Sequence, residues 1–332
     1  MGDKLNTAVI GVGNMGRHHA RVYSQLDGVN LVAVADPDKK NGQDTASKYG
    51  CRYYDDYREM LTKEKIDAVS SAVPTSLHRT VALFCIRKGI PILIEKPIAD
   101  SVEAARDIIR LSKKLHVPIC IGHIERFNPA IQKLKELIDK DRFGRIISIN
   151  SKRVGLFPPQ IKDTDVIIDL AVHDIDICNF LIGRHCTTVS ARAGKALNSK
   201  RFDYADIILG YNGIDVTIQV NWITPVKVRA LSLTGTKGYA ELNYLNQTLK
   251  IYKSNYEKTF DSYGDYIVKF GTPDAEELNL SGAEPLRLEI ENFIDHVRTG
   301  NSNIVTARDG LNSLTIALRA SRTAELAHQR RQ

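Results

Sequence analysis

The stretch "TAVIGVGNMG" (residues 7–16) predicts the fold of the N-terminal part of the chain. Its first part is apolar and β-branched, which predicts a buried strand, and a helical pattern begins at about Asn14. Between them, Gly11, Gly13 and Gly16 form the pattern G-x-G-x-x-G, whose glycines permit a tight turn and let a pyrophosphate approach the backbone. The helix that follows adds N–H donors and the positive end of its dipole. We expect a dinucleotide to contact this turn through Gly11, Val12, Gly13, Asn14, Met15 and Gly16.

The next strand, "NLVAVAD" (residues 30–36), ends on Asp36, which stands 20 residues after Gly16. A carboxylate in this position accepts hydrogen bonds from the hydroxyls of the adenosine ribose and repels a 2′-phosphate. Asp36 therefore favours NAD over NADP, although Lys39 and Lys40 weaken that preference. The alternative is a glycine-rich turn without a ligand, followed by an aspartate that merely opens the turn "DPD".

Short β-rich runs and helical patterns alternate along the first 120 residues. This alternation predicts an α/β fold, a doubly wound parallel sheet with helices on both faces. One of these helices, at 101–115, is expected to have Asp100 as its N-cap, with Glu103 in the capping-box position.

Beyond Ile124 the pattern changes to alternating strands with hairpin signals such as "GYNGID" and "GTKGY", followed by two closing helical patterns. We therefore expect two domains. Residues 1–122 form a Rossmann dinucleotide-binding domain, and residues 123–332 form an α+β domain with an open, mostly antiparallel sheet. The second domain would bind the substrate, and its half-exposed sheet could form a subunit interface.

Composition excludes several classes of protein. Apolar residues make up 43% and charged residues 26% of the chain, as in soluble globular proteins. The net charge of +7 is scattered, with one small basic cluster in "HQRR" (328–331), so we expect no nucleic-acid partner. No apolar run approaches membrane-spanning length, and the N-terminus has no signal-peptide pattern. The five cysteines lack CxxC spacing and several lie in apolar runs, which predicts free thiols in the cytoplasm.

Polar side chains follow two further strands of the predicted parallel sheet, in "IEKPI" (94–98) and "AVPTSLH" (72–78). The carboxyl ends of such strands face the ligand crevice. A partly desolvated Lys96 there could stabilise the alkoxide that develops during hydride loss, although the pentapeptide alone would suit an exposed lysine in a turn. Thr75 could bond to the cofactor, and His78 could bind or merely pack. The expected cofactor contacts are Pro74, Thr75, His78, Glu95 and Lys96.

The segment "IIDLAVHDIDICNFL" (167–181) predicts an apolar helix that carries four ionisable side chains. At about 100° per residue, Asp169, His173 and Asp176 fall on one face, while Asp174 points elsewhere, toward solvent or a capping position. A stripe of this kind can bind a metal ion, carry out acid–base chemistry or form salt bridges.

Five motifs together resemble the glucose-fructose oxidoreductase/inositol dehydrogenase/MocA (Gfo/Idh/MocA) family over nearly the whole chain: "GVGNMG", "AVPTSLH", "IEKP", "ERFNP" (125–129) and "DLAVHDID" (169–176). The resemblance implies an NAD-dependent oxidoreductase in which Lys96, Asp169 and His173 face the substrate. It also implies a cis peptide bond between Lys96 and Pro97. One departure is "DTDVIID" (163–169), which stands where many relatives have a Gly-Gly pair and leaves the loop before Asp169 undefined.

The sequence of residues 122–130 and 166–176 looks closest to a branch of the family that acts on nucleotide sugars. That implies oxidation of a secondary ring hydroxyl, at C3 of a sugar such as UDP-N-acetylglucosamine, to a 3-keto sugar. His173 would be the general base, Asp169 would orient the hydroxyl or the imidazole, and Lys96 would stabilise the alkoxide. Whether His173 or Lys96 takes the proton stays open. Further substrate contacts are expected from Arg126, Asn128 and Arg153.

Several alternatives stay open at this stage. The substrate could be inositol, a free sugar or another glycoside, or the chain could be a non-catalytic NAD-binding sensor, which would not need Lys96, Asp169 and His173 together. A metal ion held by Asp169, His173 and Asp176 would be repelled by Lys96, so we expect none. The family resemblance and the exposed sheet imply a homodimer or homotetramer.

Overall fold

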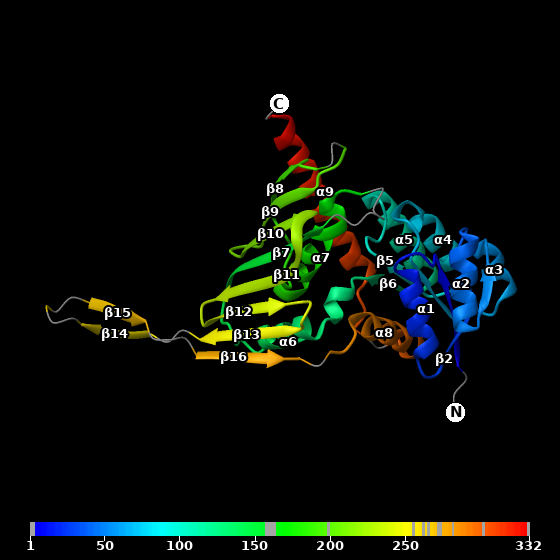
Figure 1. The fold of residues 1–332 in the computed structure, drawn as a ribbon, viewed down its shortest axis with the longest axis horizontal. Coiled ribbons are helices and arrows are strands. Elements are labelled where there is room, and N and C mark those ends of the chain that lie inside the picture. Colours follow the sequence, from blue (N-terminus) through cyan, green and yellow to red (C-terminus); the bar gives the residue numbers. More distant parts are fainter. Residues whose placement is uncertain are drawn as a thin grey trace. The chain divides into compact units, whose positions relative to one another are not determined.

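The computed structural model describes residues 4–156, 164–197, 200–253, 256–260, 263, 266–270, 274–280, 282–300 and 303–330 (Figure 1). Contacts divide the chain into two compact units, Met1–Phe127 with Glu284–Thr315 and Asn128–Ala283 with Ile316–Gln332. This grouping differs from a single division after residue 122. The difference arises because the apolar face of helix α8 (Pro285–Thr299) packs into the core of the first unit.

The first unit contains a six-stranded parallel sheet with the order β3-β2-β1-β4-β5-β6. The strands are β1 (Leu5–Ile10), β2 (Val29–Ala35), β3 (Arg52–Tyr54), β4 (Ala68–Ser71), β5 (Ile92–Glu95) and β6 (Ile119–Gly122). This is the strand order of a doubly wound dinucleotide-binding fold, and it confirms the predicted α/β class. Because the order reverses between β1 and β4, the carboxyl ends of these strands flank the crevice in which such folds bind ligands.

Helices connect these strands, and every residue of β4, β5 and β6 is buried, as expected for strands covered on both faces. The helices are α1 (Gly16–Gln25), α2 (Lys39–Tyr49), α3 (Tyr57–Lys63), α4 (His78–Arg87) and α5 (Val102–Leu115). The N-cap expected at Asp100 is wrong by one residue. Ser101 has the extended backbone of an N-cap, and its side chain accepts a hydrogen bond from the Ala104 N–H.

The second unit contains an eight-stranded sheet with the order β16-β13-β12-β11-β7-β10-β9-β8. All neighbours pair antiparallel except β7 and β10, so the predicted mostly antiparallel sheet is confirmed. The strands are β7 (Ile146–Leu156), β8 (Thr188–Gly194), β9 (Tyr204–Gly210), β10 (Asp215–Asn221), β11 (Ile223–Gly235), β12 (Gly238–Asn243), β13 (Thr248–Lys253) and β16 (Asp274–Asn279).

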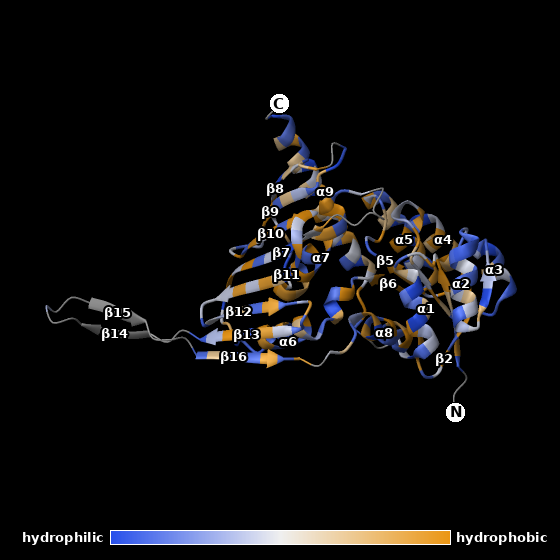
Figure 2. Cartoon of the chain, viewed as in Figure 1, coloured by the Kyte–Doolittle hydropathy of each residue, from blue (hydrophilic) through white to orange (hydrophobic). Residues whose placement is uncertain are grey.

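One face of this sheet carries the core of the second unit. Helices α6 (Pro129–Asp139) and α7 (Val172–Ile182) and the later turns of α9 (Ala307–Gln329) contribute their apolar side chains to that core. Exposed and buried residues alternate along β9 and β10, and Figure 2 shows hydrophilic and hydrophobic residues alternating along β10. The opposite face of the sheet is therefore open.

Further strands lie at the edges of this sheet and outside it. Strands β8 and β16 extend the sheet at its two ends, and β14 (Tyr256–Phe260) pairs with β15 (Tyr266–Phe270) in a separate hairpin. The helix expected at 167–181 is present, but its first turn, Ile167–Ala171, is a π-helix. Among the helices that the structure describes, none is both long and apolar enough to cross a membrane.

Candidate active site

The glycine-rich turn after β1 has the shape that a dinucleotide needs. Gly11 has φ +80°, and a Cβ there would lie 2.9 Å from the backbone of Ala72. A Cβ on Gly16 would lie 1.7 Å from the Gly11 carbonyl oxygen, so packing alone requires these two glycines. A Cβ on Gly13 would meet no heavy atom within 4 Å. Protein packing therefore does not explain Gly13, whereas the close approach of a pyrophosphate does.

The start of α1 fits the same ligand. Met15 occupies the N-cap position without a side-chain cap, and the N–H groups of Arg17 and His18 donate to the carbonyls of Gly13 and Met15, so the positive end of the helix dipole faces the turn. Asn14 is exposed at the tip of the turn, and its Oδ1 accepts a hydrogen bond from Arg17 at 2.9 Å.

Asp36 is 9% exposed and links the ends of the first two strands. Its Oδ2 accepts a hydrogen bond from the Val12 N–H at 2.7 Å, and its Oδ1 accepts one from the Asp38 N–H at 2.8 Å. Since each carboxylate oxygen can accept more than one hydrogen bond, both remain chemically able to bind ribose hydroxyls. The Val12 N–H, which follows the end of β1, thus holds the Asp36 carboxylate in place beside the glycine-rich turn.

The turn after β5 carries Lys96. The Lys96–Pro97 peptide bond is cis, as the family resemblance implied. Lys96 is partly exposed, whereas its neighbour Glu95 is buried and binds His19 Nε2 at 2.9 Å. Burial alone would raise the pKa of Glu95, but the hydrogen bond and charge of His19, together with the charge of Lys96, bring that pKa below its usual value.

Sequence reasoning missed His19, which is fully buried on the inward side of α1. The signal was present in "RHHA" (17–20), where a histidine in an otherwise apolar helix face called for a buried partner. That partner, Glu95, is 76 residues away in the sequence, so periodicity could not reveal it.

The turn after β4 leaves Pro74 exposed and Thr75 partly exposed, at the start of the short 3-10 helix η1 (Thr75–Leu77). His78 is different, with 1% of its surface exposed. Its Nδ1 lies 2.8 Å from the Pro97 carbonyl oxygen and its Nε2 lies 3.0 Å from the Val73 carbonyl oxygen. Burial lowers the pKa of His78, although the two carbonyls oppose that shift. His78 therefore binds backbone, and a cofactor contact by its ring stays a prediction.

In the second unit, Asp169 lies in the π-helical turn and His173 lies in the first turn of α7. Both side chains are partly exposed, in contrast to their apolar surroundings. The Asp165 carboxylate accepts hydrogen bonds from the N–H groups of Ile167 and Ile168 at 2.9 and 3.0 Å, and so caps this turn. Turns of π-helix are frequent at functional sites.

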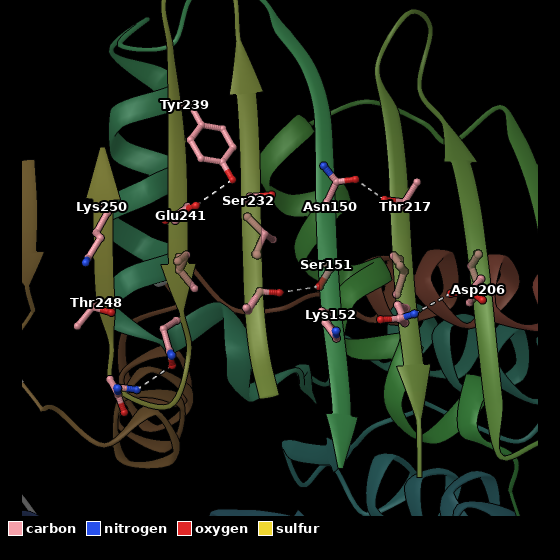
Figure 3. A pocket seen from close by; sticks show the side chains of 18 of the residues that line it. Asn150, Ser151, Lys152, Asp206, Thr217, Ser232, Tyr239, Glu241, Thr248 and Lys250 are labelled. Atoms are coloured by element: carbon pink, nitrogen blue, oxygen red, sulfur yellow. Dashed lines mark hydrogen bonds between the residues drawn. The ribbon is translucent and has the colours of Figure 1, made fainter. Parts of the chain in front are cut away.

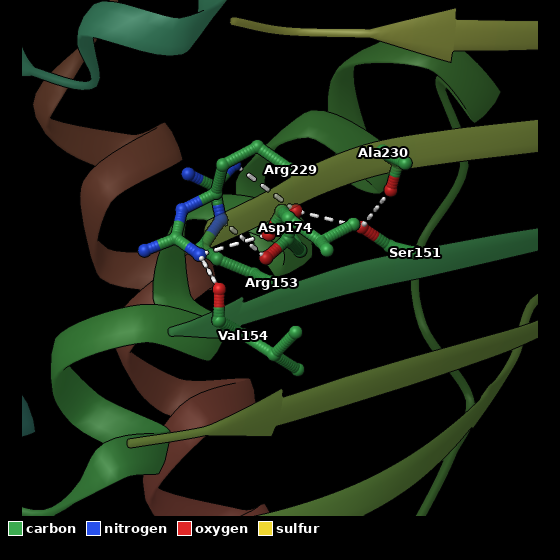
Figure 4. Close-up of polar contacts among 7 residues, drawn as sticks. Ser151, Arg153, Val154, Asp174, Arg229 and Ala230 are labelled. Carbon is green, nitrogen blue, oxygen red and sulfur yellow. Dashed lines mark hydrogen bonds and ion pairs between the residues drawn. The ribbon is translucent and has the colours of Figure 1, made fainter. Parts of the chain in front are cut away.

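Asp174 is fully buried, so the expected position toward solvent is wrong. Figure 4 shows its carboxylate facing β7, where it accepts hydrogen bonds from Arg153 Nε at 2.7 Å and from Ser151 Oγ at 2.7 Å. Arg153 is 4% exposed, and its guanidinium also lies 5.0 Å from the ring centre of Tyr244. The expectation was wrong because the face of α7 that carries Asp174 packs on the sheet. There Arg153 on β7 supplies a buried cation.

Two further expected substrate contacts have structural partners. Asn128 is 2% exposed, caps α6 by accepting from the Ala130 N–H, and donates to the Tyr244 carbonyl oxygen at 3.1 Å. Arg126 is largely buried, and its guanidinium lies 3.5 Å from the Asp309 carboxylate. Their contacts to a substrate stay predictions.

A hollow on the second unit lies on the open face of the sheet (Figure 3). Its polar side chains bond across neighbouring strands, with Thr217 donating to Asn150 and Gln219 donating to Asp206 at 3.3 Å. No expected catalytic residue lines it. Within the described ranges, no three His, Cys, Asp or Glu side chains gather closely enough to hold a metal ion.

Comparison with known proteins agrees with this geometry. Residues 5–123 match the family model of Gfo/Idh/MocA oxidoreductases with an NAD-binding Rossmann fold, and residues 135–328 match the C-terminal alpha/beta domain of the same family. The chain belongs to the Gfo/Idh/MocA family. As a member of this family it is an NAD-dependent oxidoreductase.

Individual Gfo/Idh/MocA relatives carry different names. The chain is 30% identical over 330 residues to a UDP-N-acetylglucosamine 3-dehydrogenase from Acidithiobacillus ferrooxidans, which covers 98% of this chain and 99% of the relative. A solved structure of the same-named enzyme from that organism has a TM-score of 0.85 at 29% identity, with 97% and 98% of the two chains covered. A scyllo-inositol 2-dehydrogenase (NAD(+)) from Bacillus subtilis is 28% identical, over 97% of this chain and 94% of the relative.

Proposed function

We propose that this enzyme oxidises a secondary ring hydroxyl of a sugar, at C3 of a nucleotide sugar such as UDP-N-acetylglucosamine, and forms the 3-keto sugar. The similarity to the Acidithiobacillus ferrooxidans enzyme, over nearly the full length of both chains, carries the choice of substrate. The reaction balances as alcohol plus NAD giving ketone plus NADH and a proton.

Lys96, Asp169 and His173 are the proposed catalytic residues. When bound, NAD supplies the acceptor for the hydride that leaves the ring carbon. His173 accepts the hydroxyl proton as general base, and Asp169 orients the hydroxyl or the imidazole. The Lys96 ammonium stabilises the negative charge that develops on the hydroxyl oxygen. The partial exposure of all three side chains, each beside buried neighbours, supports these roles.

The proposed cofactor contacts divide into backbone and side-chain groups. The turn at 11–16 offers backbone N–H donors and the open space beside Gly13 for the pyrophosphate. Asp36 binds the adenosine ribose, and Thr75 and Lys96 bind nearer the reacting end of NAD. Arg126 stays a proposed substrate contact, whereas Arg153 and Asn128 serve the fold through the buried partners described above.

An inositol or another free sugar is the second candidate substrate, because the Bacillus subtilis relative covers nearly as much of the chain at 28% identity. A panel of substrates separates the two. Purified enzyme with NAD is given UDP-N-acetylglucosamine, other nucleotide sugars and inositols, and NADH is measured with an aminotransferase and its amino-acid donor present to consume the keto product.

We expect NADH with a nucleotide sugar and little with inositols. Lys96→Met and His173→Ala should lower turnover by orders of magnitude while NAD binding, measured by calorimetry, survives. NADH from inositol alone would overturn the proposed substrate. No NADH from any alcohol, with NAD still bound, would favour a sensor.

We further propose that the enzyme works as a homo-oligomer in a reducing compartment, the cytoplasm. All five cysteines are free thiols, which supports the compartment. The open sheet face carries both signs of charge, including Lys152, Asp206, Glu241 and Lys250, and Ile208 on it is 53% exposed. A second copy of this face could match these charges and cover Ile208. Light scattering of wild type and Ile208→Glu tests the interface.

A further inference from the structure

Lys96 stands between two residues that are each held by a buried histidine. His19 comes from α1 and binds the side chain of Glu95, the residue before Lys96. His78 comes from α4 and binds the carbonyl of Pro97, the residue after it. The two histidines are 0% and 1% exposed. Two helices on separate connections of the fold therefore fix the same three-residue turn.

The contact from α1 also reaches the backbone of Lys96. Glu95 Oε1 lies 2.9 Å from His19 Nε2, while Oε2 accepts the Lys96 N–H at 3.2 Å. A Cβ on Gly122 would lie 3.2 Å from this carboxylate, so the glycine on β6 makes room for it. The carboxylate is thereby held from one side by an imidazole and supports the peptide that carries Lys96.

The contact from α4 joins two turns of the crevice. The ring of His78 lies between the Pro97 carbonyl after β5 and the Val73 carbonyl after β4. A neutral imidazole has one N–H and can donate to one of these oxygens at a time, whereas an imidazolium can donate to both. In either form the ring fills the space between the turns and limits how far Pro97 can move.

We propose that His19 and His78 are positioning residues that hold the Glu95–Pro97 turn from two sides and so fix the Lys96 ammonium for catalysis. This rests on the proposed role of Lys96. A charge-stabilising group acts only when it is already in place as charge develops, and a displacement of about 1 Å can lower a rate about 100-fold. Neither histidine needs to touch the substrate or NAD for this effect.

Conservative and non-conservative variants of His19 and His78 distinguish a role in positioning Lys96 from a role in packing alone. His19→Leu and His78→Leu remove the contacts, whereas His19→Gln and His78→Asn keep an N–H donor near Nε2 and Nδ1 respectively. We expect both leucine variants to lower kcat roughly 10- to 100-fold with little change in KM for NAD, and the conservative variants to regain most of it. His18→Leu, on the exposed side of the same helix, is the matched control and should keep wild-type kcat.

Double variants test whether the histidines act through Lys96. If they do, His19→Leu with Lys96→Met and His78→Leu with Lys96→Met should each be no slower than Lys96→Met alone, because the group being positioned is gone. If the histidines instead act on another part of the structure, the double variants should be slower than Lys96→Met. If a leucine variant does not fold, Glu95→Gln replaces His19→Leu, and His78→Gln replaces His78→Leu, in the same comparison.

The outcomes distinguish this inference from the function on which it rests. Wild-type turnover in Lys96→Met would reject the catalytic role of Lys96 itself. Slow turnover in Lys96→Met, with normal kcat in the histidine variants, would overturn the positioning role and leave the proposed function intact. Losses that multiply in the double variants would also overturn it.

Discussion

At the scale of single residues, the site depends on buried charges that have nearby partners. Glu95 would be costly in the interior without His19, and that pairing keeps a carboxylate next to Lys96. Asp36 is held in a comparable way by two backbone N–H groups at 2.7 and 2.8 Å. Each carboxylate is thus fixed before a ligand arrives, which lowers the entropy that binding would otherwise cost.

Asp36→Asn tests the cofactor side of the site. The amide keeps the size of the side chain but loses the charge, so we expect NAD to bind roughly 10-fold more weakly, in line with the loss of a charge-assisted hydrogen bond. The preference for NAD over NADP should also fall. Calorimetric titration of both nucleotides measures these changes, with Asp38→Asn, at the exposed N-cap of α2, as the control. Unchanged affinities in Asp36→Asn would reject its ribose contact.

Single residues also show where sequence reasoning stops. The positions of the three glycines, Asp36 and Lys96 at strand ends could be predicted, because they follow from the strand pattern and a known spacing. The partners of His19, His78 and Asp174 could not, because each depends on which distant segment packs against it. Burial reverses the interpretation of a charged residue, and burial is decided by tertiary contacts.

At the scale of elements, α7 is anchored by one buried ion pair. Asp174 on the helix binds Arg153 and Ser151 on β7, and these contacts fix the rotation of the helix on the sheet (Figure 4). The rotation determines where the side chains of Asp169 and His173, which lie away from this contact, are presented. The ion pair therefore supports the proposed site although it lies inside the core.

Removing one partner of this pair leaves a buried charge alone. We expect Asp174→Ala to lower the free energy of unfolding by about 3–5 kcal/mol. Glu291→Ala, which removes the exposed Arg287–Glu291 pair on α8, should leave stability nearly unchanged. Urea unfolding at neutral pH measures both. A loss in Asp174→Ala as small as that in Glu291→Ala would show that the pair does not anchor α7.

Most elements could be predicted because their apolar periodicity is strong. The buried strands of the first unit are short apolar runs, and apolar and polar residues alternate strictly along β10. Strand β16, with the sequence DAEELN, has almost no apolar residue and lies at the edge of its sheet, so pairing rather than pattern makes it a strand. The π-helical turn before α7 has no distinguishing composition either, and it changes the angle between Asp169 and the residues after it.

At the scale of the whole molecule, the two units divide the proposed work. The first unit has the strand order and the glycine turn of a dinucleotide-binding fold, and the second presents Asp169 and His173 on a helix anchored to a wide sheet. Family membership follows from matches to both parts of the chain. The proposed substrate rests on sequence similarity, because solved structures of a UDP-N-acetylglucosamine 3-dehydrogenase and of a myo-inositol 2-dehydrogenase both share this fold.

In the proposed reaction the hydride comes from C3 of a nucleotide sugar. This proposal is tested most directly with UDP-N-acetylglucosamine deuterated at C3, incubated with the enzyme and NAD, with mass spectrometry of the nicotinamide product. We expect NADH that carries the deuterium, and unlabelled NADH when the deuterium is placed at C4 instead. Labelled NADH from deuterated inositol, with none from any ring position of a nucleotide sugar, would contradict it.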